Sequence, residues 1–237
     1  MYKKKYIAVA IPCYMTDINV TIKIINKIPF FVDKIILIDD ACPFKTGEKI
    51  KKKIKNLEII FNKKNIGVGG SVMKAYKKVQ NKNGYIFKID GDGQMDPKYI
   101  KSILEKMINR NLDYIKGNRF KKYKILFNQM PLHRIFGNYI LSYLSQISSN
   151  YKNIFDCTNG YTCLNLNLVN SLPLNKIHKR FFFEIDMLHY LFSINAKIQD
   201  FYMPAYYGKE KSNLNLSVII PQFSFLLLKN FLNRKFK

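Results

Sequence analysis

The sequence predicts an α/β protein whose mostly parallel sheet is flanked by helices on both faces. Short apolar strands alternate with amphipathic helices, and polar residues follow one strand after another. The chain has 237 residues, 48% of them hydrophobic, which is enough for one full α/β core. This composition is that of a folded protein and excludes a disordered chain.

Strands and helices alternate regularly along the first part of the chain. The first strand is an apolar run that ends at Pro12, and the helix after it has isoleucines at helical spacing. The expected strands are 6–12, 34–38, 57–61 and 85–89, and the expected helices are 17–28, 47–55 and a glycine-rich entry at 65–71 that continues through 79.

The second part begins with a helix that runs from Pro97 to about residue 109, with Asp96 as its cap. A strand (113–120), an amphipathic helix (130–148), a turn (156–161), a strand-like run and an apolar stretch (180–188) follow. Glu184 and Asp186 interrupt that apolar stretch, where acids are costly unless they are paired or functional. They indicate a functional pair, helix-start stabilisation, or ion pairing with Arg180 and its neighbours.

The motif Asp90-Gly91-Asp92-Gly93-Gln94 directly follows the fourth strand. Two carboxylates and an amide oxygen are ligands that a hard divalent cation prefers. An isolated motif of this kind is usually only a turn between a strand and a helix. Other strands, however, also end in polar residues, among them Tyr14, Thr16, Asp39 and Asp40. Ligands of parallel sheets lie beyond the carboxyl ends of the strands, so the sequence predicts one crevice there.

The glycines around Gly67 match neither a dinucleotide-binding fingerprint nor a P-loop, which argues against a dehydrogenase or a P-loop NTPase. They either present backbone amides to a ligand or permit a tight loop. Four cysteines form no CxxC pair and three histidines form no HExxH motif, which disfavours zinc and thiol redox chemistry. No signal peptide is recognisable, so we expect reduced thiols in the cytosol.

The net charge of +24 favours anionic partners. A nucleic acid, anionic lipids and phosphorylated substrates all fit it, and a lysine-rich genome would also explain it. Because no nucleic-acid-binding motif accompanies the charge, we expect no nucleic-acid partner. The competing class is a non-catalytic basic α/β protein that binds nucleic acid or serves as a membrane-associated partner.

The carboxyl-terminal segment, from Leu216 to Phe236, mixes large apolar residues with lysine and arginine. That composition suits a membrane interface, and a terminal helix packed on the core is the alternative. No apolar run reaches the roughly 20 residues that span a bilayer.

The motifs in this order and spacing resemble the family 2 glycosyltransferases with the GT-A fold. The resemblance covers about residues 6–214 and is strongest to dolichol-phosphate mannosyltransferases and to bacterial polyprenyl-phosphate or surface-polysaccharide sugar transferases. Its parts are Ile-Pro-Cys-Tyr (11–14), Ile-Asp-Asp (38–40), Asn-Ile-Gly-Val-Gly-Gly (65–70), Asp-Gly-Asp-Gly-Gln-Met-Asp-Pro (90–97), Gly-Asn-Arg (117–119), Asp-Cys-Thr-Asn-Gly-Tyr (156–161) and Ser-x-Leu (212–214).

The resemblance implies roles for residues of the crevice. For the nucleoside-diphosphate sugar it implies Pro12, Tyr14, Asp39, Asp40, Gly67, Asp90, Gly91 and Asp92. For Mg²⁺ or Mn²⁺ it implies Asp90, Asp92 and Gln94, and for donor or acceptor phosphates Arg119, Arg134, Lys209 and Lys211. Asp186, or failing it Glu184, is the expected general base if the acceptor is a sugar hydroxyl.

The expected reaction is a metal-dependent, inverting transfer of one sugar to a polyprenyl phosphate or a lipid-linked saccharide, in bacterial-type O-antigen or capsule synthesis. The Gln-x-x-Arg-Trp motif of processive synthases is missing, and the chain has no tryptophan. Met15-Thr16 stands where the family commonly has an acid, which puts that ribose contact in question.

The same resemblance suggests a division of the chain. Residues 1–213 would form the catalytic domain, with a nucleotide-sugar half (1–120) and an acceptor half (121–213), and 214–237 an amphipathic tail. We expect a cytoplasmic protein that lies peripherally on the cytoplasmic face of the inner membrane.

Overall fold

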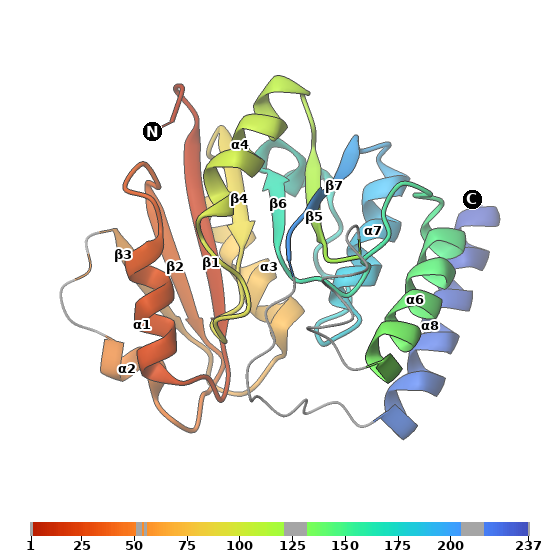
Figure 1. Cartoon of the computed structure of the whole chain (residues 1–237), viewed down its shortest axis with the longest axis horizontal. Helices are drawn as coiled ribbons and strands as arrows, with labels where there is room; N and C mark the ends of the chain where they lie inside the picture. The colour runs from red at the N-terminus through yellow and green to blue at the C-terminus, as the bar shows by residue number, and fades with distance from the viewer. Residues whose placement is uncertain (1, 51–53, 55, 121–131, 205–215, 237) are drawn as a thin grey trace.

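A computed structural model describes residues 2–50, 54, 56–120, 132–204 and 216–236 (Figure 1). Its centre is a seven-stranded sheet with the order β3-β2-β1-β4-β6-β5-β7. The strands are β1 (Tyr6–Cys13), β2 (Lys34–Asp39), β3 (Leu57–Phe61), β4 (Gly84–Lys88), β5 (Tyr114–Asn118), β6 (Thr162–Asn165) and β7 (Ile198–Tyr202). Strands from before and after residue 120 belong to this one sheet, so the two expected halves share it.

The sheet is mostly parallel, as the sequence predicts. Only β6 is antiparallel to its neighbours, β4 and β5. The edge strand β7, which is parallel to β5, has no counterpart among the predicted strands. Its middle carries Gln199 and Asp200 and is only half-buried, so it lacks the apolar run that marks an interior strand.

The helices are α1 (Ile18–Lys27), α2 (Thr46–Ile50), α3 (Val68–Val79), α4 (Tyr99–Asn109), α6 (Leu132–Ser149), α7 (Phe183–Ser193) and α8 (Leu216–Lys235), with a 3₁₀ helix at Leu166–Ser171. Asp17 begins α1, because its carboxylate accepts the backbone N–H groups of Asn19 and Val20. The expected cap of α4 differs: the helix begins at Tyr99 after Lys98, which makes no side-chain capping bond, and Asp96 accepts the backbone N–H of Lys98 in the turn before it.

Two apolar layers bury the two faces of the sheet. Ile7, Val9 and Ile11 of β1 pack with α1 and α4, and the alternating Ala8 and Ala10 pack with α3 and α7. Figure 1 shows α1 and α4 in front of the sheet and α3 behind it. The side chains of β1 alternate between the layers because a strand has a period of two residues.

The carboxyl-terminal helix α8 packs beside α6 and α7 at one end of the molecule (Figure 1). The Ser148 hydroxyl donates to the carbonyl of Leu227, and the Arg234 guanidinium donates to the carbonyls of Ile147 and Ser148 at the end of α6. The tail is thus a helix held on the core along one side. Among the described helices, none is both long and apolar enough to cross a bilayer.

Candidate active site

The parallel strands bring the polar strand ends to one edge of the sheet. In the register of β1 with its neighbours, Cys13 pairs with Asp39, and Ala10 pairs with Lys88. The Thr21 hydroxyl donates to the carbonyl of Gly91 over 3.2 Å, so the Asp-Gly-Asp turn lies against the start of α1. Tyr14, Asp40 and Asp90 therefore follow three adjacent strands at the same edge.

Asp90 and Asp92 are both partly exposed at this edge. Asp92 Oδ1 accepts the backbone N–H of Gln94 at 3.0 Å, and Gly93 has a φ of 87°, which favours glycine. The described residues include no group of three His, Cys, Asp or Glu side chains that could enclose a metal. Two carboxylates and an amide oxygen fit a hard divalent cation that takes its remaining oxygens from a bound ligand and water.

Asp39 and Asp40 are buried and shape the loops beyond β2 and β3. Asp39 accepts the backbone N–H groups of Cys42 (2.7 Å) and Gly47 (2.8 Å). Asp40 accepts those of Ile66 (2.9 Å) and Gly67 (2.8 Å), and it also accepts the side-chain amide of Asn62. These bonds rigidify the loops that follow β2 and β3. A direct contact of either carboxylate with a base or ribose stays a prediction.

The glycines that begin α3 permit a close backbone approach. A Cβ on Gly67 would lie 2.5 Å from the carbonyl oxygen of Lys179, and one on Gly69 would lie 2.5 Å from that of His178. Gly70 donates its N–H to Lys179 at 2.9 Å. Of the two roles that the sequence allows, the structure supports the tight loop, because the N–H of Gly67 is already bonded to Asp40.

Exposed apolar side chains line the same edge. Pro12 is buried within β1, whereas Tyr14 directly after it is 46% exposed. Phe61, at the end of β3 opposite Asp39, is exposed as well. An exposed ring can stack on a planar base, which is how we interpret Tyr14. Sequence reasoning missed Phe61, because a phenylalanine that ends an apolar strand reads as core.

A buried charge cluster lies directly beneath the Asp-Gly-Asp turn. Lys88 Nζ lies 2.9 Å from Asp90 Oδ1 and 2.6 Å from Glu184 Oε1. Lys116 Nζ lies 3.3 Å from the other oxygen of Glu184 and donates to the carbonyl of Asn159. The cluster joins β4, β5 and α7 under the candidate metal site.

The charges of this cluster hold one another ionised. Burial raises the pKa of Glu184, but Lys88 and Lys116 outweigh it, so the pKa lies below its ordinary value. Burial lowers the pKa of Lys88, and the carboxylates of Asp90 and Glu184 reverse that effect and raise it. For Lys116 burial prevails, and its pKa is lowered. An ionised Glu184 committed to two ammonium groups is a poor proton acceptor near neutral pH.

Asp186 is tied to its own surroundings. It is buried, its Oδ2 accepts the backbone N–H of His178 at 2.7 Å, and its Oδ1 accepts the Asn230 amide at 2.8 Å. Asp186 thus links the start of α7 to α8. The general-base role expected of Asp186 or Glu184 is untested, and the partners of both carboxylates weigh against it.

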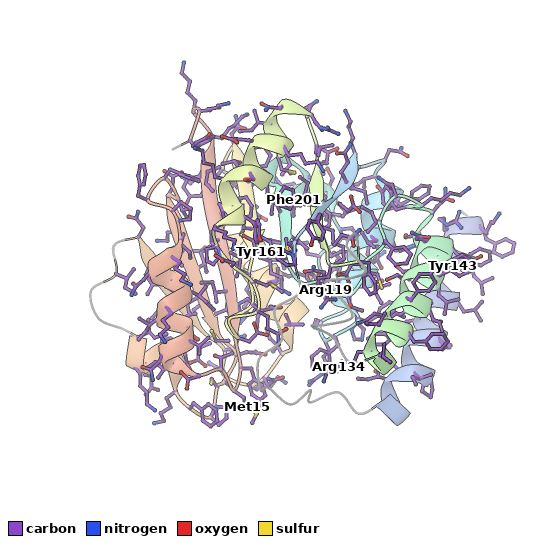
Figure 2. All side chains as sticks on the ribbon, viewed as in Figure 1. Met15, Arg119, Arg134, Tyr143, Tyr161 and Phe201 are labelled. Atoms are coloured by element: carbon purple, nitrogen blue, oxygen red, sulfur yellow. The ribbon has the colours of Figure 1, made fainter. Side chains whose placement is uncertain are left out.

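Arg119 is partly buried and forms an ion pair with the buried Asp156. Its guanidinium donates to both oxygens of Asp156, at 2.6 and 2.8 Å, and to the hydroxyl of Thr158. Arg134 lies at the base of α6 on the side that faces the sheet (Figure 2). Lys209 and Lys211 lie outside the described residues, so the structure says nothing of their expected phosphate contacts.

The family model described as glycosyl transferase family 2 matches residues 8–172, which is well over half of the chain. The chain belongs to glycosyl transferase family 2. The matched residues include the Asp-Gly-Asp turn and the strand ends around it. The fold is the GT-A fold that the resemblance implied.

Two curated relatives match part of the chain. A protein of Methanocaldococcus jannaschii is 32% identical over 144 residues, which cover 58% of this chain and 60% of the relative. The UDP-N-acetylglucosamine–dolichyl-phosphate N-acetylglucosaminyltransferase of Methanococcus voltae is 29% identical over 164 residues, covering 62% and 64%. The chain therefore spans less than two thirds of the length of these relatives.

Among solved structures, glucosyl-3-phosphoglycerate synthase from Mycobacterium tuberculosis in complex with UDP matches with a TM-score of 0.72. It shares 14% sequence identity, and the match covers 96% of this chain and 80% of the synthase. The complex of that synthase with Mn²⁺, UDP-glucose and glycerol 3-phosphate gives a TM-score of 0.69 at 13% identity, covering 98% and 80%. At this identity the likeness establishes the fold.

Proposed function

We propose that this family 2 glycosyltransferase moves one sugar from a nucleoside-diphosphate sugar to a polyprenyl phosphate, as a step in the synthesis of a cell-surface glycan. The observation that carries the proposal is the placement of Asp90 and Asp92 beside the ends of β1 and β2. A relative named for a dolichyl-phosphate acceptor and structural neighbours in complex with UDP support it.

The donor would occupy the crevice at the strand ends. Tyr14 and Asp40 would lie at its nucleoside, and Asp90, Asp92 and Gln94 would hold Mg²⁺ or Mn²⁺ at its diphosphate. A synthase of the same fold has been solved in complex with Mn²⁺ and UDP-glucose, which supports a divalent cation and a nucleotide sugar as ligands. A divalent cation at that place neutralises the charge of the departing diphosphate. Lys88 fixes the position of Asp90 from below, and Asp40 fixes the glycine loop that closes the side of the crevice.

The carboxylates of α7 favour a phosphate acceptor over a sugar hydroxyl. A phosphate oxygen is already an anion, so it can attack the anomeric carbon without a general base. The bond from that carbon to the diphosphate oxygen breaks, the nucleoside diphosphate leaves with the electron pair, and the configuration inverts. A sugar hydroxyl must lose a proton. Glu184 is paired with two buried lysines, and Asp186 accepts hydrogen bonds from His178 and Asn230, so neither is poised to accept it.

The direct test is a transfer assay with UDP-, GDP- and dTDP-sugars, a short-chain polyprenyl phosphate or a lipid-linked saccharide, and Mn²⁺. Product on the polyprenyl phosphate alone supports the proposal. Product on the saccharide alone would assign a hydroxyl acceptor and require another base. Salt-sensitive binding of random oligonucleotides without nucleotide-sugar turnover would support the competing basic binding protein.

Acceptors of this kind reside in a bilayer, so the proposal places the protein at a membrane surface. We expect it at the cytoplasmic face of the inner membrane. Fractionation of cells that express the chain tests this location, and recovery with the membrane fraction is the expected outcome.

A further inference from the structure

Large apolar side chains are exposed mainly at one end of the molecule. Of the eighteen exposed large hydrophobic residues in the described part of the chain, twelve belong to α6, α8 or the residue after α8. They are Leu132, Phe136, Tyr139, Ile140, Tyr143, Leu144, Ile147, Ile220, Phe225, Leu228, Leu232 and Phe236. We call these twelve side chains the α6–α8 face. A soluble monomer rarely gathers so many apolar side chains in one region.

Helical spacing places the members of this face in stripes. On α6, Phe136, Tyr139 and Tyr143 recur at intervals of three and four residues, while Ile135 and Ser142 are buried. That spacing keeps exposed side chains on one side of a helix. Figure 2 shows Tyr143 on the outer side of α6, away from the sheet.

The second helix repeats the pattern. On α8, Phe225, Leu228 and Leu232 form a similar exposed stripe, while Phe223 and Leu227 point into the core. The two helices lie side by side (Figure 1), and the Ser148–Leu227 hydrogen bond fixes them to each other. The exposed stripes are therefore additional to the apolar surface that the helices already use for packing.

The charges on these helices indicate what kind of partner binds the α6–α8 face. Neither α6 nor α8 contains an acidic residue, whereas α8 carries the basic residues Lys229, Arg234 and Lys235. A second copy of this +24 chain would place like charges against these cations. Aromatic and aliphatic side chains flanked only by cations match the boundary region of an anionic bilayer.

We infer that the α6–α8 face docks the protein on the surface of an anionic lipid bilayer, with both helices lying in the interface. The helix α6 is tied to the loop that adjoins the candidate active site: the Thr158 hydroxyl bonds Asn138 of α6, and a Cβ on Gly160 would lie 2.6 Å from Asp90 Oδ2. The inference rests on exposure and charge, so it holds whichever acceptor the enzyme uses.

Sedimentation of the full chain with phosphatidylglycerol–phosphatidylcholine vesicles, without substrates, tests this inference. The wild type should bind them more tightly than pure phosphatidylcholine vesicles, and added salt should weaken the binding. A Phe136→Ser, Tyr143→Ser, Phe225→Ser variant should bind more than tenfold more weakly. A Lys229→Gln, Lys235→Gln variant should lose roughly 30-fold on anionic vesicles.

Matched controls distinguish binding through the α6–α8 face from nonspecific hydrophobic adsorption and from an effect of net charge. Phe30→Ser removes a side chain that is 98% exposed in the loop before β2, and Lys23→Gln with Lys101→Gln removes two exposed charges from α1 and α4. Both controls should bind as the wild type does. Equal losses in controls and face variants, or no binding to anionic vesicles, would overturn the inference.

Light scattering after size-exclusion chromatography tests whether a second copy of the chain, rather than lipid, covers the α6–α8 face. A wild-type dimer that becomes monomeric in the Phe136→Ser, Tyr143→Ser, Phe225→Ser variant would assign the face to a second copy and contradict lipid docking. Unfolding curves of each variant establish that it is folded. Transfer to a water-soluble short-chain acceptor should persist in the face variants, so failed docking and failed catalysis are distinguishable.

Discussion

Replacing Glu184 by glutamine tests whether the buried cluster holds the floor of the site together. The substitution keeps the shape of the side chain and removes one charge from between two buried ammonium groups. The amide oxygen can still accept from one lysine, but the amide NH₂ faces the other, and neither lysine keeps the charge of Glu184; Lys116 retains the Asn159 carbonyl and Lys88 retains Asp90. The cost arises because an uncompensated charge stays buried.

The burial of the cluster sets the magnitude. The side chain of Lys116 is 0% exposed and that of Glu184 7%. Breaking such a pair costs about 3–5 kcal/mol of the free energy of unfolding. For a chain of this size that corresponds to a melting temperature lower by about 6–20 °C. Urea and thermal unfolding of Glu184→Gln beside the wild type measure both quantities.

The chain offers a matched control for this change. Glu58 also bridges two lysines, Lys34 at 2.8 Å and Lys78 at 2.7 Å, but its side chain is 27% exposed. Glu58→Gln should cost under about 1 kcal/mol, because water screens its pairs. Adding Lys116→Met to Glu184→Gln should restore part of the loss. Equal destabilisation by the two single substitutions would refute the reasoning.

Three further predictions concern packing, charge and the donor. Asp156→Asn should cost about 3–5 kcal/mol in urea unfolding at neutral pH, since it leaves the Arg119 guanidinium without its carboxylate. Burial opposes ionisation of Asp156, but Arg119 outweighs that effect and holds the pKa of Asp156 below its ordinary value. The contribution of the ion pair to the free energy of unfolding is therefore present above about pH 4 and is lost as the pH falls further. The difference in stability between the wild type and Asp156→Asn should accordingly shrink in acid. Gly69→Ala should destabilise by about 1–3 kcal/mol through collision with the His178 carbonyl, whereas Gly137→Ala, with open space around its Cβ in α6, should stabilise by up to about 1 kcal/mol. Tyr14→Ala should raise KM for the nucleotide sugar up to about tenfold while the free energy of unfolding stays within about 0.5 kcal/mol, and an unchanged KM would remove Tyr14 from the nucleoside site.

The alternation of apolar strands and helices was sufficient to predict a mostly parallel α/β sheet, whereas the GT-A fold was implied by the family resemblance. Strands such as 34–38 and 57–61 are short apolar runs bounded by polar loops, and they lie in the sheet at nearly those bounds. The edge strand β7 escaped prediction because pairing with β5, rather than an apolar run, makes it a strand. Its residue Asp200 bonds Asn118, a contact between segments far apart in the sequence.

The location of the site could be predicted from the sequence, whereas the contacts of each site residue could not. The Asp-Gly-Asp turn stands at the expected strand end, but its support by Lys88 depends on three elements meeting in space. A signal did exist, since Lys88 and Lys116 each interrupt an apolar strand and Glu184 interrupts an apolar stretch. Three charges in apolar surroundings indicate mutual pairing. Sequence alone could not show which partner each charge takes.

Calorimetric titration of UDP-N-acetylglucosamine, with and without Mn²⁺, tests the central claim most directly. The wild type should bind the nucleotide sugar in a Mn²⁺-dependent manner, and Asp92→Asn should lose at least tenfold in affinity with its unfolding curve unchanged. Glu105→Gln, whose carboxylate accepts from Tyr2 near the start of β1, is the control and should bind normally. UDP-, GDP- and dTDP-sugars are titrated in turn, because any of these nucleoside diphosphates fits the proposed donor. Undiminished, Mn²⁺-dependent binding by Asp92→Asn would contradict the assignment of the Asp-Gly-Asp turn to the diphosphate.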